Sequence, residues 1–272
     1  MKKYHIFIPL VFIFISILSG CANTSTATKE TETAYQVSTL NALMLGYYDG
    51  IVTVDELLEN GDTGLGTFDT LDGEMILLDG VVYQAKADGS VEIQSNDTTV
   101  PFCAVTFFEG DIALDGLADL GDIEAIKAVL DEAALTETGN ANLFYFAKIT
   151  GDFAMVHVRS VPAQEKPYLT LAEIAASQPE FIYESISGTI VAVRCPDYVE
   201  GINMPGWHLH FISDDGTKGG HLLDASLVEG AGQIDITTAF TLELPEDESF
   251  GALDLRSDLQ EETKQVEGKS EE

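Results

Sequence analysis

The chain has 272 residues, of which 13 are Lys or Arg and 46 are Asp or Glu, and its formal net charge is −33. This charge repels nucleic acid and anionic lipid headgroups, and a site that binds a carboxylate must supply its own positive charge. With 45% apolar and 22% charged residues, the composition is that of a globular protein and excludes a wholly disordered one.

The first 21 residues predict a lipoprotein signal peptide. Lys2 and Lys3 precede an apolar run over 6–18 that is short for a membrane-spanning helix. The run ends in Leu-Ser-Gly-Cys, which resembles the bacterial motif whose cysteine, here Cys21, is lipidated and becomes the new N-terminus. We therefore expect an extracytoplasmic protein that touches the bacterial membrane only through lipidated Cys21. An ordinary signal peptide or an uncleaved anchor is the alternative.

Residues 22–34 predict a flexible tether. The segment consists of small, polar and charged residues and contains no large apolar side chain. It cannot bury enough surface to offset the entropy lost on ordering. We expect the folded part to begin near Tyr35.

Residues 35–170 alternate between helix-like and strand-like segments, which predicts an N-terminal α/β part. A capping box of Thr53 and Glu56 predicts a short helix that ends before Asn60-Gly61, and the dipeptide Asp79-Gly80 predicts a tight hairpin. The remaining expectations are a helix or turn over 38–46, a loop over 62–66, strands over 75–78, 81–85 and 99–108, a helix capped by Asp122, and strands over 142–150 and 153–161 that turn at Gly151-Asp152.

Residues 171–272 predict a C-terminal part that is mainly antiparallel. After a helix over 169–177, strands are expected over 189–194, 207–213, 221–226 and 234–244. The acidic tail from residue 245 has no apolar period long enough to fold alone. The expected fold class is therefore α/β (α+β), in two parts: a mixed sheet with helices, then a mainly antiparallel sheet.

Three of the five histidines fall within fourteen residues and predict a metal site in this second part. His208 and His210 share one face of a strand, because side chains alternate along it. Asp215-Gly216 predicts a two-residue turn, and a hairpin centred there places His221 opposite His210. The alternative, three unrelated histidines on the surface, is therefore poor. Three imidazoles with an open fourth position are the ligands of catalytic zinc, although imidazole also suits Fe, Co, Ni and Cu.

Long sequence blocks resemble those of the α-acetolactate decarboxylases over nearly the whole range 35–267. The histidines lie in GWHLHF from Gly206, which is followed by Asp214, Asp215 and GGH. The other blocks are YQVSTLNALMLGYYDG from Tyr35, GDTGLGTFDTLDGEMILLDGVVYQ from Gly61, VPFCAVTFF from Val100 and VRSVPAQEKPY from Val158.

The resemblance implies a carboxy-lyase that converts (S)-2-acetolactate (2-hydroxy-2-methyl-3-oxobutanoate) to (R)-acetoin and CO2. It implies Zn²⁺, or another divalent metal, that stabilises the enediolate left by CO2, no organic cofactor, and a homodimer. The residues that match the family's site are His208, His210 and His221 as metal ligands, Glu74, Arg159 and Glu267 as catalytic residues, and Thr67 with Arg159 as substrate-binding residues.

Two other functions fit part of this pattern. One is a cupin-like metal oxygenase or isomerase, although those sites usually place a glutamate soon after the histidine pair, where this chain has Asp214 and Asp215. The other is a non-catalytic, metal-binding surface lipoprotein. Cys103 and Cys195 are expected as two buried thiols, with a disulfide as the less favoured alternative.

Overall fold

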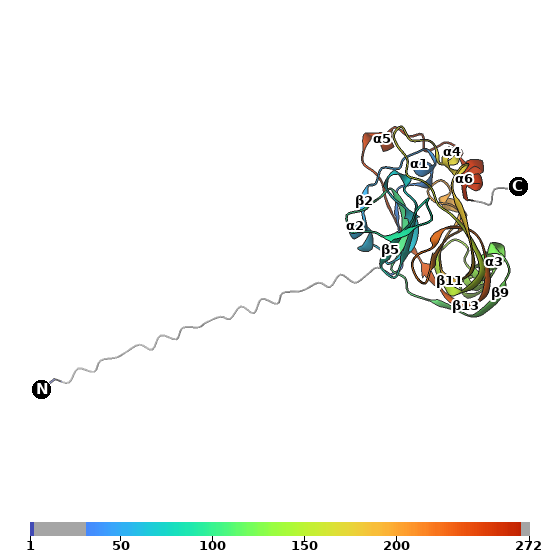
Figure 1. The fold of residues 1–272 in the computed structure, drawn as a ribbon. Coiled ribbons are helices and arrows are strands. Elements are labelled where there is room, and N and C mark those ends of the chain that lie inside the picture. The colour runs from blue at the N-terminus through green and yellow to red at the C-terminus, as the bar shows by residue number, and fades with distance from the viewer. Residues whose placement is uncertain (3–30, 268–272) are drawn as a thin grey trace.

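The computed structural model describes residues 1–2 and 31–267 (Figure 1). Residues 3–21 of the predicted signal peptide, with Cys21 among them, and most of the predicted tether lie outside the described residues. The first strand, β1 (Thr33–Val37), begins inside the range expected as tether. None of the helices in the described part is both long enough and apolar enough to cross a bilayer.

The first sheet has seven strands in the order β14-β1-β8-β3-β4-β5-β6. β1 runs parallel to β14, and its other neighbour is antiparallel, so the sheet is mixed. Besides β1, its strands are β3 (Thr63–Thr67), β4 (Glu74–Leu78), β5 (Val81–Ala85), β6 (Val91–Ile93), β8 (Phe102–Thr106) and β14 (Ala239–Glu243).

The second sheet is antiparallel and rolls up beside the first (Figure 1). Its order is β10-β11-β12-β13-β9, and β10 also pairs with β13, which closes the sheet on itself. Helix α3 (Ile123–Thr138) packs its apolar face on the core of this sheet. The strands are β9 (Ile112–Leu120), β10 (Phe144–Arg159), β11 (Glu180–Cys195), β12 (Gly206–Ser213) and β13 (Gly219–Thr237).

Short helices gather at one end of the molecule, where Figure 1 shows α1, α4, α5 and α6. Leu43 of α1, Leu171 of α4 and Val266 of α6 belong to one apolar cluster. The bounds of the helices are α1 Leu40–Met44, α2 Val54–Leu58, α4 Leu171–Ala175, α5 Glu248–Gly251 and α6 Gln260–Glu267. Two 3₁₀ turns cover Asp69–Leu71 and Asp197–Val199. A separate two-stranded sheet pairs β2 (Val52–Thr53) with β7 (Thr99–Val100).

The expected fold class is confirmed: a mixed sheet with helices and an antiparallel sheet. The sheets do not divide at residue 170, however, because β9 and β10 belong to the second sheet and β14 returns to the first. The tail also contains two helices. Asn41 of α1 donates from Nδ2 to the carbonyl of Leu255 at 3.1 Å, and α6 packs beside α4, so the tail is ordered by the surface beneath it.

Two expectations based on glycine are wrong. The segment expected as a loop over 62–66 is strand β3, and the two strands expected around Gly151-Asp152 are the single strand β10. A Cβ on Gly64 would lie 2.1 Å from the carbonyl oxygen of Ala104, and one on Gly151 would lie 2.3 Å from that of Glu229. These glycines permit close approach of neighbouring backbones and do not mark turns.

The hairpin that carries the histidines has the expected register and a different turn. His210 pairs with His221, as the spacing predicts. The chain does not turn in two residues at Asp215-Gly216, because Ser213 N already bonds to Lys218 O at 2.8 Å across a longer loop. Ser213 Oγ accepts from the backbone N–H groups of Thr217 and Lys218, which stabilises that loop. β13 then continues without a break through the gap expected at 227–233.

Candidate metal centre

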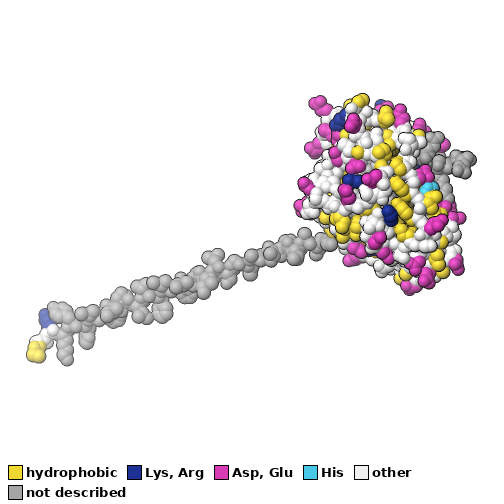
Figure 2. Space-filling view, viewed as in Figure 1, with side chains coloured by type: hydrophobic (Ala, Val, Ile, Leu, Met, Phe, Trp, Pro, Cys, Tyr) yellow, Lys and Arg dark blue, Asp and Glu magenta, His cyan; other side chains and the backbone are white. Residues whose placement is uncertain are grey.

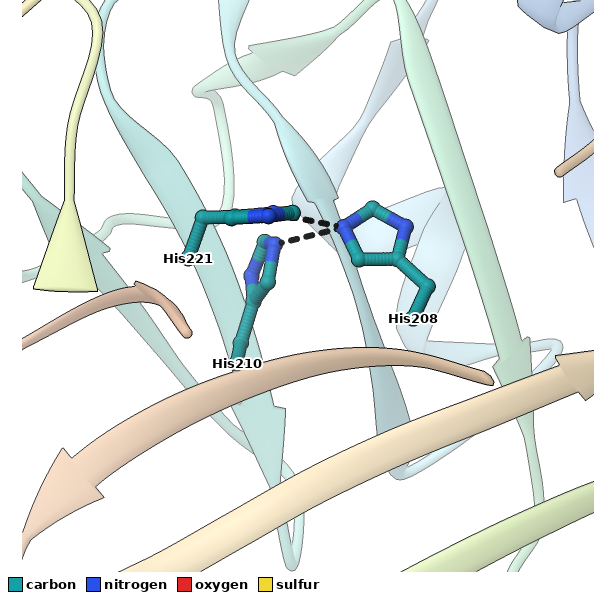
Figure 3. A group of neighbouring side chains, drawn as sticks. All are labelled: His208, His210 and His221. Atoms are coloured by element: carbon teal, nitrogen blue, oxygen red, sulfur yellow. Dashed lines mark hydrogen bonds between the residues drawn. The ribbon is translucent and has the colours of Figure 1, made fainter. Parts of the chain in front are cut away.

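Three imidazole rings converge where β12 meets β13 (Figure 3). His208 Nε2 lies 3.1 Å from His210 Nε2 and 2.9 Å from His221 Nδ1. The three ligand atoms lie within 4.8 Å of one another. Alternation along β12 explains the arrangement, because Trp207, Leu209 and Phe211 face the core under α3 and leave the histidines on the opposite face.

The surroundings of the rings favour their neutral form. Burial, with a smaller contribution from the nearby Arg159 cation, lowers the pKa of His208 to about 3 and that of His221 well below its usual value. His210 is 1% exposed, and its Nδ1 lies 2.8 Å from the carbonyl oxygen of Met75. A carbonyl only accepts, so Nδ1 of His210 carries a proton, and in the neutral ring Nε2 has a lone pair directed at the other two rings.

This donor set fits a divalent transition metal. Neutral imidazole nitrogens are the ligands of Zn²⁺ and of several neighbouring metals. The Met75 carbonyl fixes one ring from behind, which is the usual second contact of a metal-binding histidine. Among the described residues these three are the one group of His, Cys, Asp and Glu side chains close enough to hold an ion. The expectation that His208, His210 and His221 converge is confirmed.

Arg159 brings positive charge to the same place. It is the last residue of β10, is 4% exposed, and pairs in register with His221 on β13. With the Gln178 amide turned so that its oxygen faces the guanidinium, that oxygen accepts from Arg159 Nε at 3.3 Å and from Nη1 at 3.0 Å. Strand pairing and this amide hold the guanidinium beside the histidines.

The first sheet supplies a carboxylate and a hydroxyl. Glu74 and Thr67 are paired across β4 and β3, and Glu74 Oε2 lies 3.6 Å from His210 Nε2. Glu74 is only 12% exposed, and Thr67 Oγ1 donates to the carbonyl of Gly73 at 2.7 Å. Side chains that are distant in sequence therefore meet between the sheets.

A cavity of about 40 Å³ joins these groups. Thr67, Glu74 and Arg159 line it together with His208 and His221, so five of the expected site residues share one space. Its other lining residues are Leu40, Leu43, Gly66, Leu71, Phe102, Val161, Leu171, Gln178 and Val266.

The tail reaches this cavity through α6. Val266 is 4% exposed and lines the cavity wall. Glu267 is the last residue of α6 and follows Val266 directly. The position of the Glu267 side chain lies outside what the structure describes, so its catalytic role stays a prediction.

Sequence reasoning missed three contributors to the site. Gln178 carries no motif, and the carbonyl of Met75 and the apolar wall of Val266 are recognisable only once distant elements pack together. The cysteines take no part: Cys103 and Cys195 are buried free thiols, and burial raises the pKa of both.

Comparisons with known proteins agree on one family. A family model described as alpha-acetolactate decarboxylase matches residues 34–257. The chain is 47% identical over 235 residues to an alpha-acetolactate decarboxylase of Methanosarcina mazei, covering 86% of this chain and 79% of that protein. It is 38% identical to the one of Lactococcus lactis subsp. cremoris over 222 residues, which are 81% of this chain and 92% of that protein.

A solved structure agrees with this relationship. The alpha-acetolactate decarboxylase of Bacillus subtilis strain 168 superposes with a TM-score of 0.82 at 34% identity, covering 87% of this chain and 99% of that one. The match to the family model ends at residue 257, so α6 lies beyond it.

Proposed function

Since this chain belongs to the alpha-acetolactate decarboxylase family, we propose that it decarboxylates (S)-2-acetolactate to (R)-acetoin and CO2 at the histidine centre. The observation that carries the proposal is the cavity that His208 and His221 share with Arg159 and Glu74, where Glu74 also lies 3.6 Å from His210. A non-catalytic metal binder has no need of a buried arginine there. No described feature favours the cupin-like alternative.

We propose that Arg159 grips the substrate carboxylate. Its planar guanidinium can donate two parallel hydrogen bonds, which fix the carboxylate relative to the ketone. A divalent ion on the three histidines, Zn²⁺ by the chemistry of the donors, would supply the Lewis acid that stabilises the negative charge left when CO2 departs. Gln178 keeps the guanidinium in place by accepting from Nε and Nη1.

We assign delivery of the proton to the enediolate to the glutamates, with Glu74 as the first candidate. Glu74 is largely shielded from solvent and lies beside His210, so it can hold a proton close to the reacting carbons and deliver it to one face. Delivery from one side gives a single acetoin enantiomer. Thr67, its neighbour across the strand pair, lines the substrate side of the cavity, and Glu267 is the second candidate at the end of α6.

The direct test is turnover of racemic acetolactate by the purified protein, followed by chiral analysis of acetoin. We expect (R)-acetoin and CO2, loss of turnover after removal of metal by a chelator, and recovery when Zn²⁺ is restored. Bound metal without any turnover would instead favour a metal-binding surface lipoprotein. Dependence on O2 would favour the cupin-like alternative.

Truncation after Thr263 is expected to lower turnover or enantiomeric purity far more than stability. The cut removes the end of α6, including the cavity wall at Val266 and the carboxylate of Glu267. Loss of one buried valine costs about 1.5–3 kcal/mol, which lowers the melting temperature by only several degrees. Acetoin yield, enantiomeric excess and thermal unfolding measure the two effects separately.

Two point variants separate the two possible roles of the tail, the apolar cavity wall and the carboxylate. Val266→Ala keeps the carboxylate and weakens the wall, whereas Glu267→Gln keeps the wall and removes the charge. If Glu267 handles the proton, Glu267→Gln alone should reproduce the loss of turnover or enantiomeric purity expected for the truncated protein. If the truncated protein keeps full yield and enantiomeric purity, the tail has no part in the reaction.

We propose separately that the protein is extracytoplasmic and anchored to the membrane by lipidated Cys21, which the lipoprotein-like sequence ending at Cys21 supports. Cys21→Ser is expected to move the protein from the membrane fraction to the soluble fraction with turnover unchanged, because the described fold begins ten residues later. Cell fractionation with an activity assay measures both. Retention in the membrane through residues 6–18 would contradict lipid anchoring. A homodimer stays a prediction from the family resemblance.

A further inference from the structure

A second cavity, of about 230 Å³, reaches the histidines from another direction. His208 and His221 line it as well as the smaller cavity that contains Arg159. Beyond it lies a groove of about 850 Å³. The groove and the second cavity share four lining residues: Glu124, Lys127, Met204 and Trp207. The groove and the second cavity therefore adjoin at these four residues, and we take them together as the route from the surface to the histidines.

Lys127 stands where the groove meets the second cavity. It lies on α3 beside the buried face formed by Ile123 and Ile126. The start of this helix is held in place, since Ile123 N donates to Asp224 Oδ1 of β13 at 3.0 Å. Lys127 lines the second cavity together with His208 and His221, so its side chain and two of the histidines border the same space.

The charges around the route explain why a cation matters at this point. Asp and Glu side chains are spread over the face shown in Figure 2, with few Lys and Arg among them. Asp122 and Glu124 also line the second cavity, and Lys127 is its one positively charged residue within the described chain. In the outer groove, Arg194 pairs with Asp131 at 2.9 Å and Arg256 pairs with Asp254 at 3.1 Å, so each arginine there has an acidic partner.

We propose that Lys127 is a binding residue that draws the 2-hydroxy-carboxylate anion from the groove toward the histidines and passes it to Arg159. This rests on the proposed function and adds the residue that lets an anion enter so acidic a protein. A cation in a partly enclosed cavity raises the local concentration of anions. Its effect therefore falls on substrate capture and not on the chemical step.

The pairing of Lys127 with Glu124 leaves this role intact. Lys127 Nζ lies 3.1 Å from Glu124 Oε1, and the side chains are 30% and 76% exposed. An ion pair with one such exposed partner contributes little, because water screens it, so an arriving carboxylate can replace Glu124. Glu124→Gln is then expected to strengthen capture, because it removes the competing carboxylate.

The kinetic test compares Lys127→Met, Lys127→Arg and Glu124→Gln with the unaltered protein at low and high ionic strength. We expect Lys127→Met to lower kcat/KM roughly five- to tenfold at low salt, through KM, with kcat and metal content unchanged. Near 1 M salt the difference should shrink to within about twofold. Lys127→Arg should restore capture. An equal loss of kcat at every salt concentration would overturn the proposal.

A binding test separates this proposal from the decarboxylase activity itself. Trp207 is the chain's single tryptophan and lines both the groove and the second cavity. Its fluorescence can follow binding of 2-hydroxy-2-methylpropanoate, an anion that lacks the ketone and does not react. Weaker binding in Lys127→Met, with recovery in Lys127→Arg, supports the proposal even if acetolactate is not turned over. Equal affinity in all variants, or no binding to the unaltered protein, overturns it.

Discussion

His210→Asn is expected to abolish metal binding and to lower turnover by on the order of 10³-fold or more. The asparagine amide can still donate to the Met75 carbonyl, which His210 Nδ1 approaches at 2.8 Å. It has no group in place of Nε2, so one of three converging ligands is lost while the buried hydrogen bond is kept. Metal analysis of the dialysed protein and an acetoin assay measure the two losses.

Thermal unfolding gives a second measure of the same loss. A ligand that binds only the folded state stabilises it by about 2.7 kcal/mol at a hundred times its Kd. Added Zn²⁺ should therefore raise the melting temperature of the chelator-treated protein and leave that of His210→Asn unchanged.

His157→Asn is the matched control. His157 lies on β10 and contacts Glu180 Oε2 at 2.8 Å, outside the three-histidine group. It should keep metal, turnover and the response to Zn²⁺. Full metal content in His210→Asn would contradict a site built on these three rings.

Arg159→Lys is expected to lower kcat/KM about a hundredfold while metal content stays unchanged. Lysine keeps the charge but replaces a planar fork by a single ammonium, so the carboxylate is no longer held at two points. It also loses the paired contacts to the Gln178 oxygen at 3.3 and 3.0 Å. Steady-state kinetics with acetolactate, together with metal analysis, separate this effect from loss of the centre.

Arg194→Lys provides the control for the same chemical change. Arg194 lies on β11, and its Nε donates to Asp131 at 2.9 Å. A small effect there and a large one at residue 159 would assign the carboxylate grip to Arg159. If Arg159→Lys kept full activity, another group would have to hold the carboxylate.

Short-range patterns were sufficient for much of the fold. The capping box of Thr53 and Glu56 starts α2 as expected, and Asp122 caps α3 through Ala125 N. Asp79 and Gly80 both have positive φ, as the expected two-residue turn between β4 and β5 requires. Each of these features depends on residues within a few positions of one another, so the local sequence is enough to predict it.

The spacing of the three histidines is also a short-range pattern. Residues two apart in a strand share a face, and the hairpin register places His221 opposite His210. The turn differs from the expected one, yet the register is kept. The sequence alone therefore determined that the three histidines lie together.

The surroundings of the centre were decided by tertiary structure. Glu74 belongs to one sheet and His210 to the other, and no local pattern specifies that their side chains lie 3.6 Å apart. The family resemblance indicated Glu74 and Arg159, but their shared cavity follows from how the two sheets pack. Gly64 and Gly151 looked like loop or turn residues, because glycine serves turns and close backbone contacts alike. Only the position of the neighbouring strand distinguishes the two roles, and that position is set by contacts between residues far apart in the chain.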